Sequence, residues 1–112
     1  MEIIYDKLVR DNIPEIITAN GEIPVTRILN DEEYLKYLYK KDSEELEEVI
    51  NANSPEERKK ELADKLQLLI AMANYDGYTL EDIIKESEKK KSRNGGFEKR
   101  ILLEKVISNN SK

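Results

Sequence analysis

Apolar side chains recur every three or four residues along the middle of the chain, which is the spacing of amphipathic helices. Over residues 31–51 one helix face collects a stripe of Leu35, Leu38, Leu46, Val49 and Ile50. The stretch "LQLLIAMA" (66–73) is apolar almost all round, which predicts burial. We therefore predict long helices over 31–51, 55–75 and 80–93, and a short helix from about residue 12 to residue 19.

Capping residues mark where these helices begin. Asn30 with Glu33 has the spacing of a capping box, in which each side chain satisfies a free backbone N–H of the first turn. Ser54 is followed by Pro55, which is favoured at the first helical position. Thr79 has the same place before the third long helix. The predicted helix starts therefore rest on local chemistry as well as on the apolar period.

Two segments have an extended pattern instead. Residues 22–29 and 97–107 contain β-branched residues in partial alternation, and Asn94-Gly95-Gly96 interrupts the chain before the second of them. A small two-stranded β element is one interpretation, and a helical tail is another. The fold class that we predict is mainly α, an antiparallel helix bundle with that β element as an addition.

Composition narrows the function. The chain has 112 residues, which favours a single domain over 1–112, and its net charge of −5 argues against nucleic-acid binding. It contains no run of 18 apolar residues, and its first ten residues lack a signal-peptide core, so we expect a soluble, cytoplasmic protein without a membrane partner. Without Cys or His, any metal site must use oxygen ligands, which suits Mg²⁺, Mn²⁺ or Ca²⁺.

The acidic residues of 31–51 can be sorted by helix face, since each residue turns the helix by about 100°. Glu45 falls at the edge of the apolar stripe, and Glu48 lies just beyond it. Glu47 projects to the opposite side, among lysines. A solvated charge run therefore explains Glu47 well and Glu45 poorly.

The next helix repeats this arrangement. Leu68 lies two turns beyond Glu61 on nearly the same line, with Asp64 beside them, so the helix face changes from acidic to apolar. Carboxylates that point into a core are costly unless they are paired or bind a metal.

The link at 52–54 is short, so the two helices should be antiparallel neighbours. Pairing them in this way brings Glu45 near Asp64 and Glu48 near Glu61. Four converging carboxylates are enough to hold one or two Mg²⁺ ions with some waters retained.

The acidic motifs, E-E-x-x-E at 44–48 and E-x-x-D at 61–64, resemble the signature of the MazG-type all-α nucleotide pyrophosphohydrolases. "KLVRDNIPEII" (7–17) and "GGFEKRILLEK" (95–105) are similar to the ends of a small, phosphoribosyl-ATP pyrophosphohydrolase-like subgroup. Together with "VTRILNDEEYL" (25–35), the resemblance covers nearly the whole chain.

This resemblance implies a fold of the all-α NTP pyrophosphatase type and Mg²⁺-dependent cleavage between the α and β phosphates of a nucleoside triphosphate, giving the monophosphate and pyrophosphate. It implies that the metal ligands are Glu45, Glu48, Glu61 and Asp64. Glu44 would be a further ligand or would orient the water, and Glu44 or Glu45 could accept its proton. Relatives act on phosphoribosyl-ATP or remove non-standard nucleotides, so both substrates are alternatives. A catalytically silent helical oligomer is a third.

A phosphate substrate beside so many acids also needs cations. The candidates for phosphate binding are Lys7, Arg10, Lys89, Lys90 and Arg93. The last three also fit a favourable charge cluster at a helix C-terminus, and Arg10 also fits a surface ion pair.

Two positions depart from the family pattern. Asp42 stands where relatives tend to carry an apolar residue, and Lys65 stands where they tend to carry valine. In the antiparallel register these two residues are close enough to form a compensating ion pair. If Lys65 reached the carboxylates instead, it would compete with the metal.

One chain of this length can hardly cover the apolar faces of three long helices. We therefore expect self-association, as a homodimer or as a tetramer built from dimers.

Overall fold

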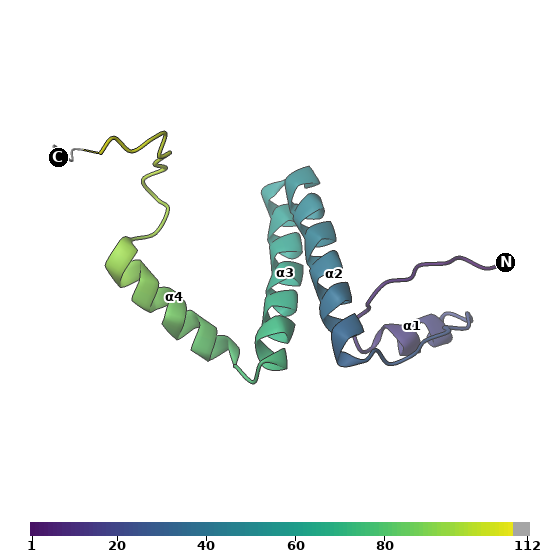
Figure 1. Cartoon of the computed structure of the whole chain (residues 1–112). Coiled ribbons are helices and arrows are strands. Elements are labelled where there is room, and N and C mark those ends of the chain that lie inside the picture. Colours follow the sequence, from purple (N-terminus) through teal and green to yellow (C-terminus); the bar gives the residue numbers. More distant parts are fainter. Residues whose placement is uncertain (109–112) are drawn as a thin grey trace. The chain divides into compact units, whose positions relative to one another are not determined.

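The computed structural model describes residues 1–108, and its regular elements within that part are all α-helices (Figure 1). They are α1 (Ile13–Ala19), α2 (Asp31–Asn51), α3 (Pro55–Tyr75) and α4 (Leu80–Asn94). The predicted mainly-α fold is confirmed, and each predicted helix agrees to within about one residue at either end. None of the described helices has the length and apolar character needed to cross a membrane.

The predicted β element is not formed, since residues 1–108 contain no strand. Residues 22–29 and 97–107 have no regular backbone pairing. Ile23, Val25 and Ile28 are each about nine-tenths exposed, so the apolar side chains that suggested a strand are not packed. An isolated two-stranded ribbon is at best marginally stable in water, and here it has no apolar surface to lie on.

The predicted caps of α2 and α3 are present, and the predicted cap at Thr79 stays a prediction. The Asn30 side chain accepts a hydrogen bond from the Glu33 N–H at 2.9 Å, and the Glu33 carboxylate accepts one from the Asn30 N–H at 3.4 Å. The Ser54 hydroxyl accepts one from the Glu57 N–H at 3.1 Å. These contacts satisfy backbone donors that have no partner inside the helix, and so they determine where α2 and α3 begin.

Glu33 also ties the preceding segment to α2. Arg27 donates two hydrogen bonds to its carboxylate, at 3.0 and 2.7 Å. The Arg27 guanidinium, followed by the Asn30 backbone, lowers the pKa of Glu33 from 4.5 to about 2. This bidentate pair joins the segment before α2 to its first turn, away from the acidic residues of the later turns.

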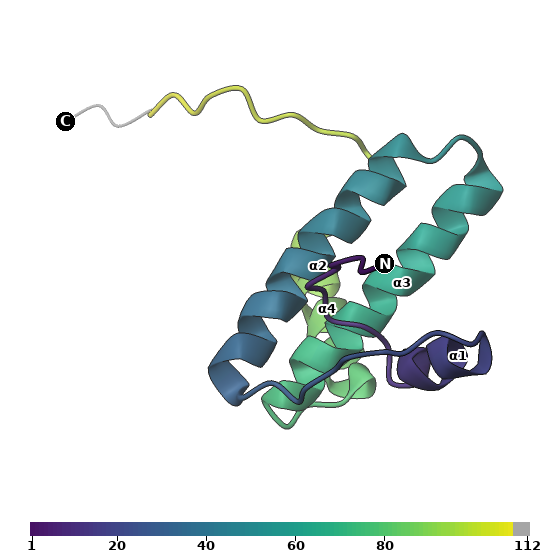
Figure 2. The same ribbon diagram turned by 90° about the vertical axis from the view of Figure 1, so that its right-hand side faces the viewer.

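Helices α2 and α3 form an antiparallel pair joined by the short link at 52–54 (Figures 1 and 2). Tyr34 near the start of α2 packs on Tyr75 at the end of α3, with ring centroids 6.2 Å apart. Among the described residues the buried apolar side chains are Leu38, Leu68 and Ala73, all from this pair. The small core therefore lies along the seam between α2 and α3.

The chain divides into two compact units, residues 1–80 and residues 81 onward. The first holds α1, α2 and α3, and the second holds nearly all of α4 with the segment that follows it. The charges of α4 suit a helix dipole, with Glu81 and Asp82 in the first turn and Lys91 and Arg93 in the last. A single functional domain over the whole chain stays a prediction.

The cap at Ser54 gives a direct stability prediction. Ser54→Ala removes the acceptor for the Glu57 N–H and should lower the free energy of unfolding by about 1 kcal/mol. Ser43→Ala, the same substitution at an exposed position inside α2, should change it by less than about 0.5 kcal/mol. Urea denaturation of both variants measures the difference. Equal effects would show that the Ser54 hydroxyl does not cap α3.

Candidate metal centre

Glu45 is the buried carboxylate of α2. It lies two turns after Leu38, so the α-helical repeat directs it to the same side, toward α3. Only 9% of Glu45 is exposed, and it is the buried charged residue of the described part of the chain. Glu47, on the other side of the helix, is exposed. The prediction that Glu45 points inward and Glu47 outward is confirmed.

Helix α3 supplies the opposing carboxylates. Glu61 and Asp64 are one turn apart and partly buried, and the buried Leu68 follows one turn later. One carboxylate oxygen from each of Glu45, Glu61 and Asp64 lies within 4.8 Å of the others. The predicted convergence across the antiparallel pair is therefore observed for these three residues, which we call the acidic triad.

The acidic triad holds two buried oxygens without partners. Glu45 Oε2 and Glu61 Oε2 are shielded from solvent, and no donor of the described residues reaches either of them. A buried acceptor without a donor costs free energy, and a buried charge costs more. The arrangement becomes favourable when a cation or a proton satisfies these oxygens.

The pKa values of the buried carboxyls reflect the same cost of burying like charges. Burial, followed by the neighbouring carboxylates of Glu48 and Asp64, raises the pKa of Glu45 from 4.5 to about 7. The pKa of Glu61 is also raised, chiefly by Glu48 and then by burial. Since like charges at short range oppose ionisation, Glu45 and Glu61 without a metal retain protons to a higher pH than isolated carboxyls do.

Glu48 occupies a different position from the other predicted ligands. Its side chain is exposed, and it lies outside the acidic triad, although it is near enough to Glu45 and Glu61 to raise the pKa of each. It is therefore placed at the solvent side of the triad. Its role as a fourth ligand stays a prediction.

The donor set fits a hard divalent cation. Three carboxylates on two helices offer oxygen ligands without nitrogen or sulfur, which is the kind of donor that Mg²⁺ takes in proteins. Mn²⁺ accepts the same ligands. The two unpartnered buried oxygens are the observation that favours an ion over a solvated acidic surface.

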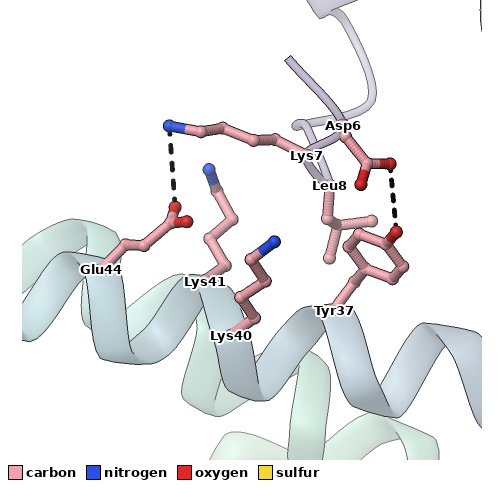
Figure 3. Close-up of a pocket in the computed structure, with 7 residues that line it drawn as sticks. All are labelled: Asp6, Lys7, Leu8, Tyr37, Lys40, Lys41 and Glu44. Atoms are coloured by element: carbon pink, nitrogen blue, oxygen red, sulfur yellow. Dashed lines mark hydrogen bonds and ion pairs between the residues drawn. The ribbon is translucent and has the colours of Figure 1, made fainter. Parts of the chain in front are cut away.

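The segment before α1 brings two cations to these acids. Arg10 donates a hydrogen bond from Nη2 to Asp64 Oδ1 at 2.6 Å, and Lys7 Nζ lies 3.8 Å from Glu44 Oε2. The predicted alternative for Arg10, an ion pair with a carboxylate, is therefore present. Its partner Asp64 is a member of the acidic triad. Glu44 itself is only partly buried and faces Lys7 on the outer side of α2 (Figure 3).

A shallow pocket surrounds that contact. Its lining is Asp6, Lys7, Leu8, Tyr37, Lys40, Lys41 and Glu44. The Tyr37 hydroxyl donates to Asp6 Oδ1 at 3.1 Å, and this bond raises the pKa of Tyr37 (Figure 3). The Leu8 side chain lies beside the Tyr37 ring (Figure 3). The contact between Asp6 and Tyr37 was not expected from the sequence, since an irregular segment has no period that predicts its partner.

The predicted pair of Asp42 and Lys65 is present. Lys65 Nζ donates to Asp42 Oδ1 at 2.7 Å, across α2 and α3 and beside the acidic triad. The ammonium group of Lys65 therefore has a carboxylate partner outside the triad. The alternative in which Lys65 occupies the metal ligands is not what the structure shows.

The remaining predicted phosphate-binding residues belong to α4. Lys89, Lys90 and Arg93 are exposed, and Lys89 Nζ lies 3.8 Å from Glu86 of the same helix. They belong to the second unit, and their role in phosphate binding stays a prediction.

Comparison with known proteins identifies a relative but no family. No protein-family model matches the chain, and no solved structure matches it. Over 48 residues the chain is 48% identical to an uncharacterized protein of Mycolicibacterium smegmatis. The matched stretch covers 43% of this chain and 49% of that protein, so the match spans about half of the relative's length. The function must therefore be argued from the site itself.

The raised pKa of Glu45 predicts how the stability of the metal-free protein depends on pH. Folded Glu45 binds a proton more tightly than unfolded Glu45, so its contribution is fully present below pH 4.5 and is lost as the pH rises through about 7. The loss should be of the order of 2 kcal/mol. Glu45→Gln should remove most of this pH dependence, because the amide cannot ionise.

Thermal unfolding in a chelator between pH 5 and pH 8 measures this effect. Glu47→Gln is the matched control, since Glu47 lies on the same helix but is exposed. Identical pH profiles for the wild type and Glu45→Gln would contradict the raised pKa of Glu45.

Proposed function

We propose that the protein is a Mg²⁺-dependent nucleoside triphosphate pyrophosphohydrolase of the cytoplasm, which cleaves the α–β phosphoanhydride to give a nucleoside monophosphate and pyrophosphate. The observation that carries the proposal is the acidic triad of Glu45, Glu61 and Asp64 with its two buried, unpartnered oxygens. The resemblance of the acidic motifs to those of MazG-type enzymes supports the choice of reaction.

The chemistry needs no protein nucleophile. Hydrolysis of a phosphoanhydride depends on charge neutralisation and on a positioned water, so a chain without His or Cys is not at a disadvantage. When bound, Mg²⁺ would neutralise phosphate charge and lower the pKa of a coordinated water. Glu45, Glu61 and Asp64 would hold the ion, and Glu48 would add a ligand from the solvent side.

The different burial of Glu44 and Glu45 suggests different roles for them, one as general base and the other as metal ligand. Glu45 faces the triad and serves there as a ligand. Glu44 is the next residue along, is only partly buried and pairs with Lys7 on the outer side of α2 (Figure 3), so its carboxylate must turn away from Lys7 to reach a water at the edge of the centre. We assign the role of general base to Glu44, whose carboxylate would leave Lys7 when it takes the proton of that water.

Phosphoribosyl-ATP is the alternative to a nucleoside triphosphate as the substrate. The terminal motifs "KLVRDNIPE" and "GGFEKRI" are similar to those of phosphoribosyl-ATP pyrophosphohydrolase-like proteins. Phosphoribosyl-ATP carries the same scissile bond, and so do non-canonical nucleoside triphosphates. The Asp42–Lys65 ion pair weighs against the silent oligomer, since it keeps the Lys65 charge away from the triad.

We also propose that the active form is a homo-oligomer, either a dimer or a tetramer built from two dimers. In one chain, five large apolar side chains of the helix pair are each more than two-fifths exposed. They are Leu46 and Ile50 on α2, and Leu62, Leu66 and Leu69 on α3. Burial of a large apolar side chain stabilises by about 1.5–3 kcal/mol, and the seam of the helix pair alone buries few of them. A second copy of the chain would cover these stripes and complete a helical bundle.

Sedimentation equilibrium tests this assembly. The wild type should sediment at twice or four times the mass of one chain. Leu66→Glu should shift it toward the monomer, because a charge in the apolar stripe must be desolvated on association. Gln67→Glu adds the same charge at an exposed position turned away from the stripe and should leave the mass unchanged. A monomeric wild type would contradict the assembly.

Pyrophosphate release tests the activity. The wild type should release it, with Mg²⁺ and not with a chelator, from at least one member of a panel of canonical and damaged NTPs, dNTPs and phosphoribosyl-ATP. Glu61→Gln should lower the rate by about 100-fold or more, because it removes a metal ligand. Glu47→Gln should retain the rate, since its side chain lies on the opposite side of α2. Release from no substrate, or full activity of Glu61→Gln, would contradict the proposed function.

A further inference from the structure

Arg10 places a positive charge on one member of the acidic triad. Its Nη2 lies 2.6 Å from Asp64 Oδ1, whereas the buried oxygens of Glu45 and Glu61 have no donor. In the chain without a metal, Asp64 is therefore the triad member that has a cation partner. An incoming divalent ion that uses this oxygen must displace the guanidinium.

The ion pair between Arg10 and Asp64 can be exchanged for another contact at little cost. More than half of the Arg10 side chain and about two-fifths of the Asp64 side chain are exposed. Ion pairs this exposed contribute little net free energy, because water and salt compete with them. A divalent cation that also contacts Glu45 and Glu61 would gain far more from the triad than one guanidinium does.

The segment that carries Arg10 has separate anchors on α2. The Tyr37 hydroxyl donates to Asp6 at 3.1 Å, Leu8 lies beside the Tyr37 ring, and Lys7 lies 3.8 Å from Glu44 (Figure 3). None of these contacts involves Arg10 or Asp64. Release of the arginine from Asp64 thus leaves the segment on α2 and the guanidinium beside the centre.

A released guanidinium next to a carboxylate-bound cation is matched to a phosphate as well as it is to a carboxylate, and a phosphate is the partner that a nucleotide substrate would bring. Its planar N–H donors fit two phosphate oxygens at once, and its charge persists at any pH at which the protein folds.

We propose that Arg10 is an exchangeable counter-ion: it neutralises Asp64 while the triad is empty, yields that oxygen to a divalent metal, and then positions a phosphate of the substrate. This inference rests on the proposed metal-dependent function and adds a coupling between metal and substrate. It differs from a merely structural tie, in which Arg10 would hold Asp64 in place for the metal.

The two roles predict opposite signs for one variant. If Arg10 is a counter-ion, the Arg10→Gln variant should bind Mn²⁺ about two- to fivefold more tightly than the wild type, since the competing cation is gone. If Arg10 is a structural tie that holds Asp64 in place, the same variant should bind Mn²⁺ more weakly. Titration of free Mn²⁺ by electron paramagnetic resonance gives the dissociation constants directly.

Arg27→Gln is the matched control for charge. Arg27 also donates to a single carboxylate at 2.7 Å, but its partner is Glu33, before the turns that carry the triad. The control should bind Mn²⁺ as the wild type does. Arg10→Lys keeps the charge and should restore the wild-type affinity for Mn²⁺.

Substrate positioning is tested with inorganic triphosphate at saturating Mg²⁺, by calorimetry. Arg10→Gln should bind it about fivefold or more weakly, since a charge-assisted contact is lost, and Arg10→Lys should recover only part, because an ammonium lacks the planar pair of donors. In NMR spectra of the wild type, Mg²⁺ alone should move the Arg10 side-chain Nε–H signal, which is assigned by its absence in Arg10→Gln.

Each result decides between the possibilities. Tighter Mn²⁺ binding with weaker triphosphate binding by Arg10→Gln would support the exchange. Unchanged or weaker Mn²⁺ binding by Arg10→Gln, with a wild type that binds Mn²⁺, would overturn the exchange and leave the proposed function intact. A wild type that binds no Mn²⁺ would overturn both.

Discussion

The burial of like charges between two helices is the constraint on which the rest of the structure depends. Glu45 and Glu61 face each other across the seam of α2 and α3, and an oxygen of each is shielded from water without a donor. Apolar side chains at these positions would give a more stable pair. The helices hold the acids together although they repel, which is the arrangement expected when a cation belongs to the folded state.

The surrounding contacts are arranged so that this repulsion does not separate the helices. Caps at Asn30 and Ser54 set the starts of α2 and α3. The Asp42–Lys65 pair joins the two helices beside the triad, and Arg10 neutralises Asp64 at its open side. Positive charge thus reaches Asp64 and the edge of the triad, whereas the buried oxygens of Glu45 and Glu61 keep no protein donor.

Much of this was predictable because helices are local. The apolar period and the caps depend on residues three or four apart, so the bounds of α2 and α3 follow from the sequence, and so does the inward direction of Glu45. The short link then determined the antiparallel register, from which the closeness of Asp42 and Lys65 also followed. Contacts of the irregular segments were harder to predict. Nothing in residues 1–12 specifies that Arg10 meets Asp64, 54 positions away, or that Asp6 meets Tyr37. The alternation in 22–29 was misleading, because a strand needs a neighbour and an apolar surface that this part of the chain does not provide.

A crystal of the protein soaked in Mn²⁺, with diffraction measured on both sides of the manganese absorption edge, tests the metal centre most directly. We expect an anomalous peak between the carboxylates of Glu45, Glu61 and Asp64, with Arg10 no longer on the Asp64 oxygen that the ion uses. Absence of a peak there at millimolar Mn²⁺, with the buried oxygens of Glu45 and Glu61 bonded to protein donors instead, would contradict the metal centre and the function proposed from it.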